Sequence, residues 1–412
     1  MSHVRLIKLS WRNVWRNRRR SLITIAAISF SIVIVALMRS LQYGTYDAME
    51  SLAVSLFHGE IQIQRQGFQE EQTLEYAFDG NAHDWHGLVH LYPEITAVSQ
   101  RVTGFGLVSS DSSSAGALLV GIEPEYESKI TRFSTMLAAG ETLQTRDDHQ
   151  VLLGASLAKN LRVDVGDTIS VLTQGYHNEL GADLYRIKGL LKLGNAELDR
   201  SLLVMTLENA QEIFSLYNQI TQVVLHTNDF RKANAVANKI AQNLDAQYAV
   251  LPWEKLMPEL KQIILLDNIS GAIYLVFLLL VVGFEIFNTT MMSLMERIRE
   301  FGLLQSLGMK PVQIGNHLLM ESLMKIFLAL IMGLFVAMVL VSILSHHPIP
   351  LSEKIREGYA SYGLVIENMK FSTKSRIYLE PVVAITLIAL MAIIYPIIKT
   401  IKLTPVEALR KT

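Results

Sequence analysis

The histidines and acidic residues between positions 39 and 268 are the side chains that could form a metal or catalytic site. His83 and His86, in the sequence HDWH, have the i, i+3 spacing of a zinc-ligand pair, but no third ligand is evident nearby. Asp147 and His149 lack the context of a nucleophile. The chain has no cysteine, which excludes disulfides and thiolate metal sites. We interpret these residues as surface or loop positions, and the sequence DSSSAG (111–116) as a flexible loop.

The sequence contains no motif for binding or hydrolysing a nucleotide. The pattern G-x-x-x-x-G-K-[ST], whose backbone amides would surround the phosphates of ATP, does not occur. We therefore expect no catalytic residue and no cofactor on this chain. If ATP drives its function, another polypeptide must hydrolyse the nucleotide.

Three ionisable residues lie within apolar segments, where charge is costly and usually faces protein or water. Glu285 and Lys325 each lie about ten residues from the same end of their segments, at roughly 15 Å depth, given a rise of about 1.5 Å per residue. They could form an intramembrane ion pair, and Glu321, one turn from Lys325, could share it. In the alternative, Lys325 extends towards the cytoplasm, while Glu285 is protonated or faces a wet cavity.

Four apolar segments position these residues. A membrane-spanning helix needs about 20 apolar residues to cross a hydrocarbon core of roughly 30 Å. Helices of globular domains carry a polar face, which these segments lack. We therefore predict an α-helical membrane protein with spans at 21–38, 269–294, 318–344 and 381–398.

Lysine and arginine positions predict the orientation of the spans. Seven basic residues and no acid precede the first span, which keeps the N-terminus in the cytoplasm. Four spans return the tail, 399–412, to the same side, together with the loop 295–317. The segment 39–268 and the connector 345–380 then lie outside. An uncleaved anchor is favoured over a signal peptide because no A-x-A-like site follows. Residues 1–20, in which Trp11 and Trp15 lie among arginines, are typical of a helix in the headgroup layer.

The segment 39–268 differs in character from the spans. It has 17 Lys and Arg against 29 Asp and Glu, a net charge of −12, which argues against binding to nucleic acid or flat on anionic lipid. Short β-type runs alternate with helical stretches, so we predict a mixed α+β domain inserted between the first two spans, with a possible division into two lobes. The runs are 59–66, 116–124, 167–173, 184–194 and 200–206, and the helical stretches are 154–161, 207–217 and 229–244.

The loop 295–317 has its own pattern. Met295, Ile298 and Leu303 could line one side of a short helix, with acids and arginines on another. Gly308 can end this helix, and Pro311 can begin the next one. A helix held against the membrane by two spans can transmit force to a protein docked beneath it. The alternative is a solvated turn whose charges mark the membrane edge.

The sequence ERIREFGLLQSLGMKPVQI (296–314) resembles the signature of FtsX-like ABC transporter permeases between their second and third spans. The stretches 151–172 and 185–214 are similar to the MacB-type external domain, and TPVEALR (404–410) to the C-terminal tail of the family. Four spans with a large domain after the first also match the family's order.

The resemblance implies the membrane subunit of a MacB-like or lipoprotein-releasing (LolC/LolE-like) transporter in the bacterial inner membrane. Such a permease, paired with a second copy or a paralogue, works with two ATPase subunits that bind ATP and Mg. It moves an external domain by mechanotransmission, with no substrate crossing the bilayer core. By the same resemblance, the residues that couple to the ATPase are Glu296, Arg297, Arg299, Glu300, Gly302, Leu304 and Gly308, beside Pro405, Glu407 and Arg410 of the tail.

The cargo stays open at this point. The leading hypothesis is that the cargo is a lipoprotein or another amphiphile extracted from the outer leaflet. Alternatives are efflux of macrolides or peptides with a periplasmic adaptor, and a regulatory scaffold that controls a cell-wall hydrolase. Division-type relatives of the last kind have a small external domain, so an external segment of about 230 residues favours a transporter.

Overall fold

The computed structural model describes residues 3–361 and 368–402, which form two compact units. Of the described residues, 3–47, 264–350 and 368–402 belong to the helical unit. Residues 48–263 and 351–361 belong to the sheet unit.

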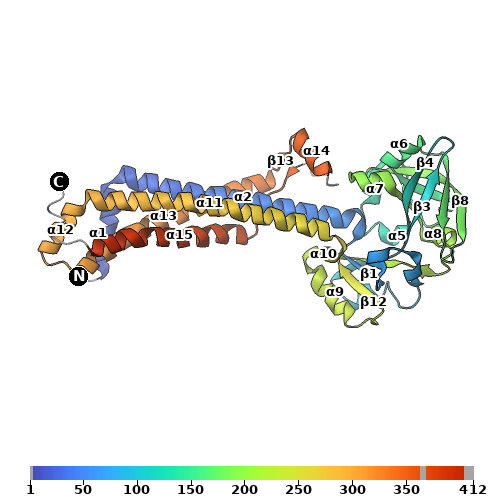
Figure 1. Ribbon diagram of the computed structural model, residues 1–412, viewed down its shortest axis with the longest axis horizontal. Helices are drawn as coiled ribbons and strands as arrows, with labels where there is room; N and C mark the ends of the chain where they lie inside the picture. Colours follow the sequence, from blue (N-terminus) through green and yellow to red (C-terminus); the bar gives the residue numbers. More distant parts are fainter. Residues whose placement is uncertain (1–2, 362–367, 403–412) are drawn as a thin grey trace. The chain divides into compact units, whose positions relative to one another are not determined.

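Four long helices dominate the helical unit and lie side by side (Figure 1). They are α2 (Arg18–Ala53), α11 (Pro258–Glu296), α13 (Pro311–His346) and α15 (Arg376–Ile401). Each contains one predicted span, and within the described chain these four are long and apolar enough to cross a membrane. Both α2 and α11 continue well beyond their apolar stretches, as expected for helices that extend outside the bilayer.

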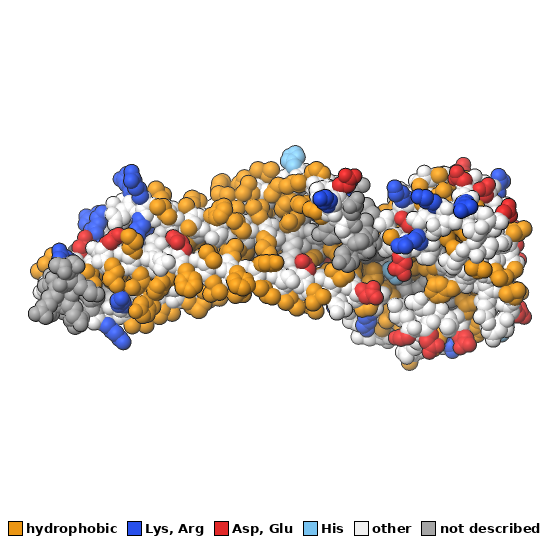
Figure 2. Space-filling model, turned by 45° about the horizontal axis from the view of Figure 1, so that its top comes forward, with side chains coloured by type: hydrophobic (Ala, Val, Ile, Leu, Met, Phe, Trp, Pro, Cys, Tyr) orange, Lys and Arg blue, Asp and Glu red, His pale blue; other side chains and the backbone are white. Residues whose placement is uncertain are grey.

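The four helices share a buried core and expose apolar side chains outward. Ile28, Ile326 and Ile385 are among the core residues, each at most 5% exposed. Phe277 and Phe335, in contrast, are 64% and 68% exposed. Figure 2 shows hydrophobic side chains covering the surface of these helices, with Lys and Arg gathered at one end. Exposed apolar surface of this extent is stable in lipid but not in water, so the chain is a membrane protein.

Polar contacts join three of the helices at the end far from the lysine and arginine cluster. Tyr43 of α2 donates a hydrogen bond to Glu380 of α15 at 3.0 Å, and the Arg39 guanidinium lies 3.3 Å from the same carboxylate. Tyr46 of α2 donates to Asp267 of α11 at 2.6 Å. These bonds fix α2 against both neighbours at this level.

The N-terminal segment forms the predicted helix, α1 (His3–Arg16). Val14 is fully buried, whereas Trp11 and Trp15 are 46% and 36% exposed. The helix is thus two-sided, with its tryptophans on the outer side. Its place in a headgroup layer stays a prediction.

The sheet unit is built on a ten-stranded sheet with the order β12-β1-β11-β3-β4-β9-β6-β8-β5, in which β7 pairs with β3 and β8. Most neighbours are antiparallel, but β4 pairs with β9, and β6 with β8, in parallel. The strands are β1 (Ile61–Arg65), β3 (Ile95–Ser109), β4 (Ser114–Ile122), β5 (Leu137–Gly140), β6 (Gln150–Gly154), β7 (Thr168–Gln174), β8 (Leu180–Leu191), β9 (Leu202–Thr206), β11 (Gln222–Thr227) and β12 (Tyr248–Pro252).

Short elements complete the described chain. Two-stranded ladders join β2 (Phe78–Asp79) to β10 (Gln219–Ile220) and β13 (Ile349–Pro350) to β14 (Asn368–Met369). The helices are α3 (Phe68–Glu71), α4 (Leu88–Leu91), α5 (Pro124–Glu127), α6 (Ala155–Leu161), α7 (Ala196–Ser201), α8 (Leu207–Ile213), α9 (Ala233–Ala241), α10 (Trp253–Leu256), α12 (Ile298–Ser306) and α14 (Glu353–Ser361), with a π-helical turn, η1 (Val54–His58), and 3₁₀ turns η2 (Leu74–Tyr76), η3 (Phe133–Met136) and η4 (Phe230–Lys232).

The predicted mixed α and β architecture is confirmed, and one local prediction holds only in part. All five predicted strands and all three predicted helical stretches are present. Of the predicted loop 111–116, residues 111–113 form the turn of the β3–β4 hairpin, whereas Ser114 already pairs with Ser109. The long strand β3 was not predicted. It carries both halves of the sheet, since it pairs with β11 along its first half and with β4 along its second.

A buried ion pair holds the centre of β3. Arg101 is fully buried and binds the carboxylate of Glu127, itself 1% exposed, with two nitrogens. Arg101 also donates to the carbonyl of Phe57 at 2.6 Å and lies over its ring. This arrangement ties β3 to α5 and to η1.

Glu127→Gln should therefore lower the free energy of unfolding of the sheet unit by about 3–5 kcal/mol, because a buried guanidinium loses its counter-charge. The temperature at which this unit becomes sensitive to trypsin measures the effect in the full-length chain. Glu141→Gln, at an exposed position, is the matched control. Equal melting of both variants would show that the Arg101 pair contributes nothing to stability.

Candidate functional site

The backbone around α12 follows from two residues with special conformations. Arg297 separates α11 from α12, with φ −108° and ψ 11°. Gly308 has φ +93°, and the amides of Gly308 and Met309 bond back to the carbonyls of Gln305 and Leu304 at 2.9 and 3.0 Å. This is a Schellman cap, for which glycine is the preferred residue. The expected helix end at Gly308 and helix start at Pro311 are confirmed.

A buried carboxylate between two cations links α12 to α13. Glu321 of α13 is 4% exposed and accepts a hydrogen bond from Arg297 at 2.7 Å and another from Lys325 at 2.9 Å. Arg297 is 7% exposed, and its guanidinium lies 5.0 Å from the ring of Phe301. Charges at this depth are stable only when paired, so this contact constrains where α12 sits.

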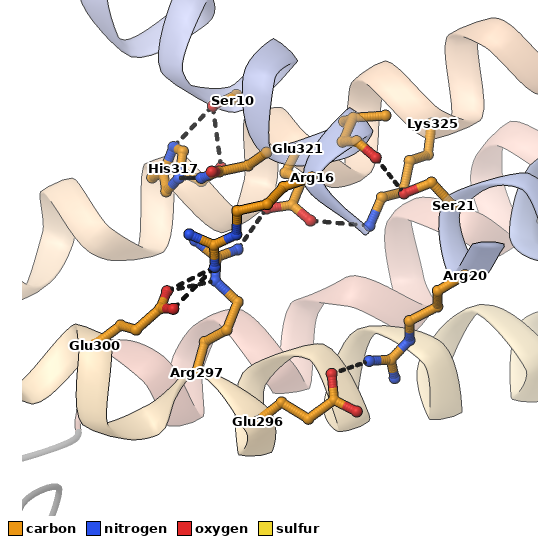
Figure 3. Close-up of polar contacts among 12 residues, drawn as sticks. Ser10, Arg16, Arg20, Ser21, Glu296, Arg297, Glu300, His317, Glu321 and Lys325 are labelled. Atoms are coloured by element: carbon orange, nitrogen blue, oxygen red, sulfur yellow. Dashed lines mark hydrogen bonds and ion pairs between the residues drawn. The ribbon is translucent and has the colours of Figure 1, made fainter. Parts of the chain in front are cut away.

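Two further ion pairs join α12 and the end of α11 to the N-terminal helices (Figure 3). The Arg16 guanidinium donates to both oxygens of Glu300 at 2.9 Å, and Arg297 donates to the same carboxylate at 3.1 Å. Although partial burial raises the pKa of Glu300, the bonds from Arg16 and Arg297 outweigh it and hold this pKa below its usual value. Arg20 of α2 binds Glu296 of α11 at 2.6 Å.

A third contact joins α1 directly to α13 (Figure 3). His317 is 2% exposed, and its two ring nitrogens lie 2.8 Å from the hydroxyl of Ser10 and 2.8 Å from the amide nitrogen of Asn13. With both ring nitrogens bonded, the imidazole has one orientation. The arrangement therefore joins α1, α12 and the first turns of α13 into one polar cluster.

The two sides of α12 differ. Phe301 packs with Leu294 and Ile314, all of them at most 1% exposed. Leu303 and Leu307 are 56% and 76% exposed. The predicted apolar side of Met295, Ile298 and Leu303 is therefore wrong: Ile298 is 8% exposed, while Leu303 is 56% exposed. Both lie in α12, and a spacing of five residues places their side chains about 140° apart around a helix with 3.6 residues per turn.

The residues predicted to couple to an ATPase fall into two groups. Most of them hold α12 in place: Glu296, Arg297 and Glu300 form ion pairs, Gly302 is buried, Leu304 packs beside Phe301, and Gly308 caps the helix. Arg299 is exposed. The tail residues Pro405, Glu407 and Arg410 lie outside the described residues.

The intramembrane pair takes a different form from the hypothesis that joined Glu285 to Lys325. Lys325 binds Glu321, which was predicted to share the ion pair. The Glu285 carboxylate accepts a hydrogen bond from Thr289 of its own helix at 3.3 Å. Among the described residues, no contact between Glu285 and Lys325 supports their pairing in this conformation.

Sequence reasoning did not connect Arg16, Arg20, Ser10 or His317 to this cluster. The arginines belong to a basic run that the positive-inside rule explains equally well, so their charge carried no signal of partners almost 300 residues away. One signal was available: His317 lies in an apolar helical stretch, where a polar ring needs a partner.

The residues considered for metal binding are engaged elsewhere. His86 stacks on Tyr126 and lies 3.2 Å from a carboxylate oxygen of Glu123, which raises its pKa. His83 packs against Trp85 and Tyr248. Over residues 3–361 and 368–402, no group of three or more His, Asp or Glu side chains could hold a metal ion.

Two known domain families account for most of the chain. Residues 272–405 match the C-terminal domain of FtsX-like permeases, and residues 21–243 match the MacB-like periplasmic core domain. The chain belongs to the FtsX-like permeases with a MacB-like periplasmic core domain. Helix α12, with Glu300 and the adjoining Arg297, lies within the residues that match the FtsX-like domain.

Curated relatives of this family cover most of the chain. The lipoprotein-releasing system transmembrane protein LolC of Xylella fastidiosa is 25% identical over 343 residues, which cover 80% of this chain and 81% of that protein. LolE of Haemophilus influenzae is 22% identical over 346 residues, 81% of this chain and 82% of that protein. The periplasmic region of MacB from Actinobacillus actinomycetemcomitans matches half of this chain and 94% of its own length, with 13% identity and a TM-score of 0.36.

A double-mutant cycle separates the two possible partners of Lys325. Glu321→Gln and Lys325→Met should show a coupling energy of about 1 kcal/mol or more, because they remove two ends of one contact. Glu285→Gln and Lys325→Met should be additive within about 0.5 kcal/mol. The unfolding free energy of the full-length chain in detergent is the measurement. Strong coupling of Glu285 and none of Glu321 would contradict the described geometry.

Proposed function

We propose that this chain is the membrane subunit of an ABC transporter in which ATP hydrolysis on a separate subunit moves an external domain. The observation that carries the proposal is the two-sided α12, which the buried Arg297–Glu321 pair fixes to α13 and the exposed Arg16–Glu300 pair joins to α1, and which is exposed on its other side. A helix that is rigidly attached to the spans can pass on a displacement that a flexible loop would absorb.

The exposed side of α12 suits a docking partner. Leu303 and Leu307 offer apolar area, and Arg299 adds a cation beside them. Exposed leucines at a membrane edge are the kind of side chain that a protein interface buries. The ATPase subunit, with its own ATP and Mg, would bind here.

Motion would leave this end through α2 and α11. Each helix is continuous from the cluster side, through its apolar stretch, and past it. Arg20 and Glu296 join the two helices at one end, and Tyr46 and Asp267 join them again further along. Because α2 and α11 are joined at two levels, they would shift together. This joint shift is how motion at the ATPase side would reach the external domain, which is what mechanotransmission means.

The cargo in this proposal is a lipoprotein or another amphiphile of the outer leaflet of the inner membrane. The names of the LolC and LolE relatives support it. The termini would then be cytoplasmic and the sheet unit periplasmic, consistent with the basic N-terminus and the acidic domain. Two ATPase subunits and a second permease, either another copy or a paralogue, would complete the complex, with an adaptor or chaperone on the outer side.

Leu303→Asp combined with Leu307→Asp should weaken binding of the partner ATPase subunit by at least about 30-fold, because loss of two interface anchors costs about 2 kcal/mol or more. Co-purification and ATPase rate of the assembled complex are the measurements. Leu91→Asp, at a position 72% exposed in the sheet unit, is the control for surface charge. Normal assembly of the double variant would rule out this docking side.

Stimulation of ATP hydrolysis by candidate cargo then tests the substrate class. Purified lipoproteins should raise the ATPase rate of the reconstituted complex, and non-acylated forms of the same proteins should not. Equal stimulation by both forms would contradict the lipoprotein proposal and favour efflux or a regulatory role.

A further inference from the structure

Helix α1 and the start of α2 carry more positive charge than the described carboxylates neutralise. Five arginines lie from position 12 to position 20. Two of them, Arg16 and Arg20, bind carboxylates of α12 and α11. The other three are exposed, and across residues 3–361 and 368–402 they form no ion pair with a carboxylate. These three unpaired arginines are Arg12, Arg18 and Arg19.

The sides of α1 suit different surroundings. Ser10 and Val14 are fully buried where α1 packs on α13. Trp11 and Trp15, one turn apart, lie on another side, where their rings meet edge to face with 5.9 Å between centroids. Arg12 is exposed about 100° around the helix from Trp11. Exposed indole rings with guanidinium groups beside them are typical of a helix at the boundary between acyl chains and headgroups.

The unpaired arginines lie next to the surface that faces lipid. Leu22 and Ile23 of α2 are 51% and 63% exposed and begin the apolar surface of the four helices. Arg19 precedes Leu22 by three residues, which is about 4.5 Å along the helix axis. Figure 2 shows Lys and Arg gathered where the apolar surface ends. A cation at this position lies at the level of phospholipid headgroups rather than in bulk water.

Charge and hydrogen bonding favour an anionic headgroup at this place. A guanidinium can donate two parallel hydrogen bonds to one phosphate group. Clusters of basic residues beside a span bind anionic lipids, and each Lys or Arg contributes about fivefold to the affinity. The exposed tryptophans and leucine around the cations favour a lipid over a soluble anion, which would leave this apolar surface uncovered.

We propose that α1 and the first turn of α2 bind the headgroup of an anionic phospholipid, in the leaflet on the side of the N-terminus. The three unpaired arginines bond to its phosphate. Trp11 and Trp15 contact its glycerol and the first methylene groups of its chains. The lipid holds α1 at the membrane surface and, through the Arg16–Glu300 pair, also holds α12 there. This site needs neither the ATPase nor a cargo.

Tryptophan fluorescence of the full-length chain in lipid nanodiscs tests the binding. The chain has four tryptophans. Trp85 and Trp253 are 1% and 5% exposed within the sheet unit, so brominated acyl chains quench mainly Trp11 and Trp15. In nanodiscs of phosphatidylcholine, a minor fraction of brominated phosphatidylglycerol should quench more than the same fraction of brominated phosphatidylcholine. Trp11→Phe with Trp15→Phe should remove the difference, which identifies the source of the signal.

Charge variants then test the arginines. Replacing all three unpaired arginines by glutamine should lower the affinity for phosphatidylglycerol relative to phosphatidylcholine at least about tenfold. Replacing them by lysine keeps the charge and should keep the preference. The matched control loses the same charge at exposed positions of the sheet unit and should bind as the parent chain does. Its substitutions are Arg65→Gln, Arg132→Gln and Arg146→Gln.

Four results would overturn the inference. They are equal quenching of the parent chain by both brominated lipids, loss of the preference in the sheet-unit control, loss of it in the lysine variant, and its removal by free inorganic phosphate, which would identify a site for soluble anions. A glutamine variant that keeps the preference but no longer co-purifies with the ATPase would assign the arginines to a protein interface, and would also overturn it. The parent comparison needs no variant, so the inference stays testable if the glutamine variant fails to fold.

Discussion

The buried carboxylate of Glu321, held between Arg297 and Lys325, is the interaction on which the helical unit depends. Burying the carboxylate alone, or either cation alone, would cost too much free energy for the fold to be stable. The three charges must therefore meet, which lets α12 and α13 fit together in one register only. Glu300 then joins the same Arg297 to Arg16, and α1 becomes part of the group. These contacts hold a short helix between two spans in one position. Its other side, with Leu303 and Leu307, is exposed.

The large features could be predicted from sequence because each depends on local patterns. Four apolar runs whose lengths lie within or above the range that crosses a bilayer core define four helices, and Gly308 with Pro311 define a helix end and a helix start. The strands of the sheet unit follow from alternation between turn residues. The sequence did not predict the long strand β3, because glycines and polar residues interrupt its apolar pattern. Its extended conformation depends on pairing with β11 and β4 on its two edges.

The charged cluster could be predicted only in part, since its partners are far apart in the chain. The motif 296–314 marks Arg297 as a functional residue. Whether its side chain faces an ATPase or Glu321 depends on the break between α11 and α12 at Arg297, which the motif does not define. A spacing argument placed Glu285 and Lys325 at one depth, yet depth does not define which way a helix turns its side chains. Gln62 and Gln64 of β1 present the reverse case, because alternation of apolar and polar residues is typical of a strand with one face in solvent, yet both glutamines are 2% exposed. Long-range packing decides both outcomes.

The central claim is that α1, α12 and the start of α13 move as one body when ATP acts on the complex. Since the chain has no cysteine, spin labels at Arg12→Cys and Ser306→Cys report the distance between α1 and α12 in the assembled transporter. The account predicts one narrow distance that is the same without nucleotide and with ATP bound. A distance that shifts or broadens on ATP binding would show that α12 moves independently of α1, and would contradict the account.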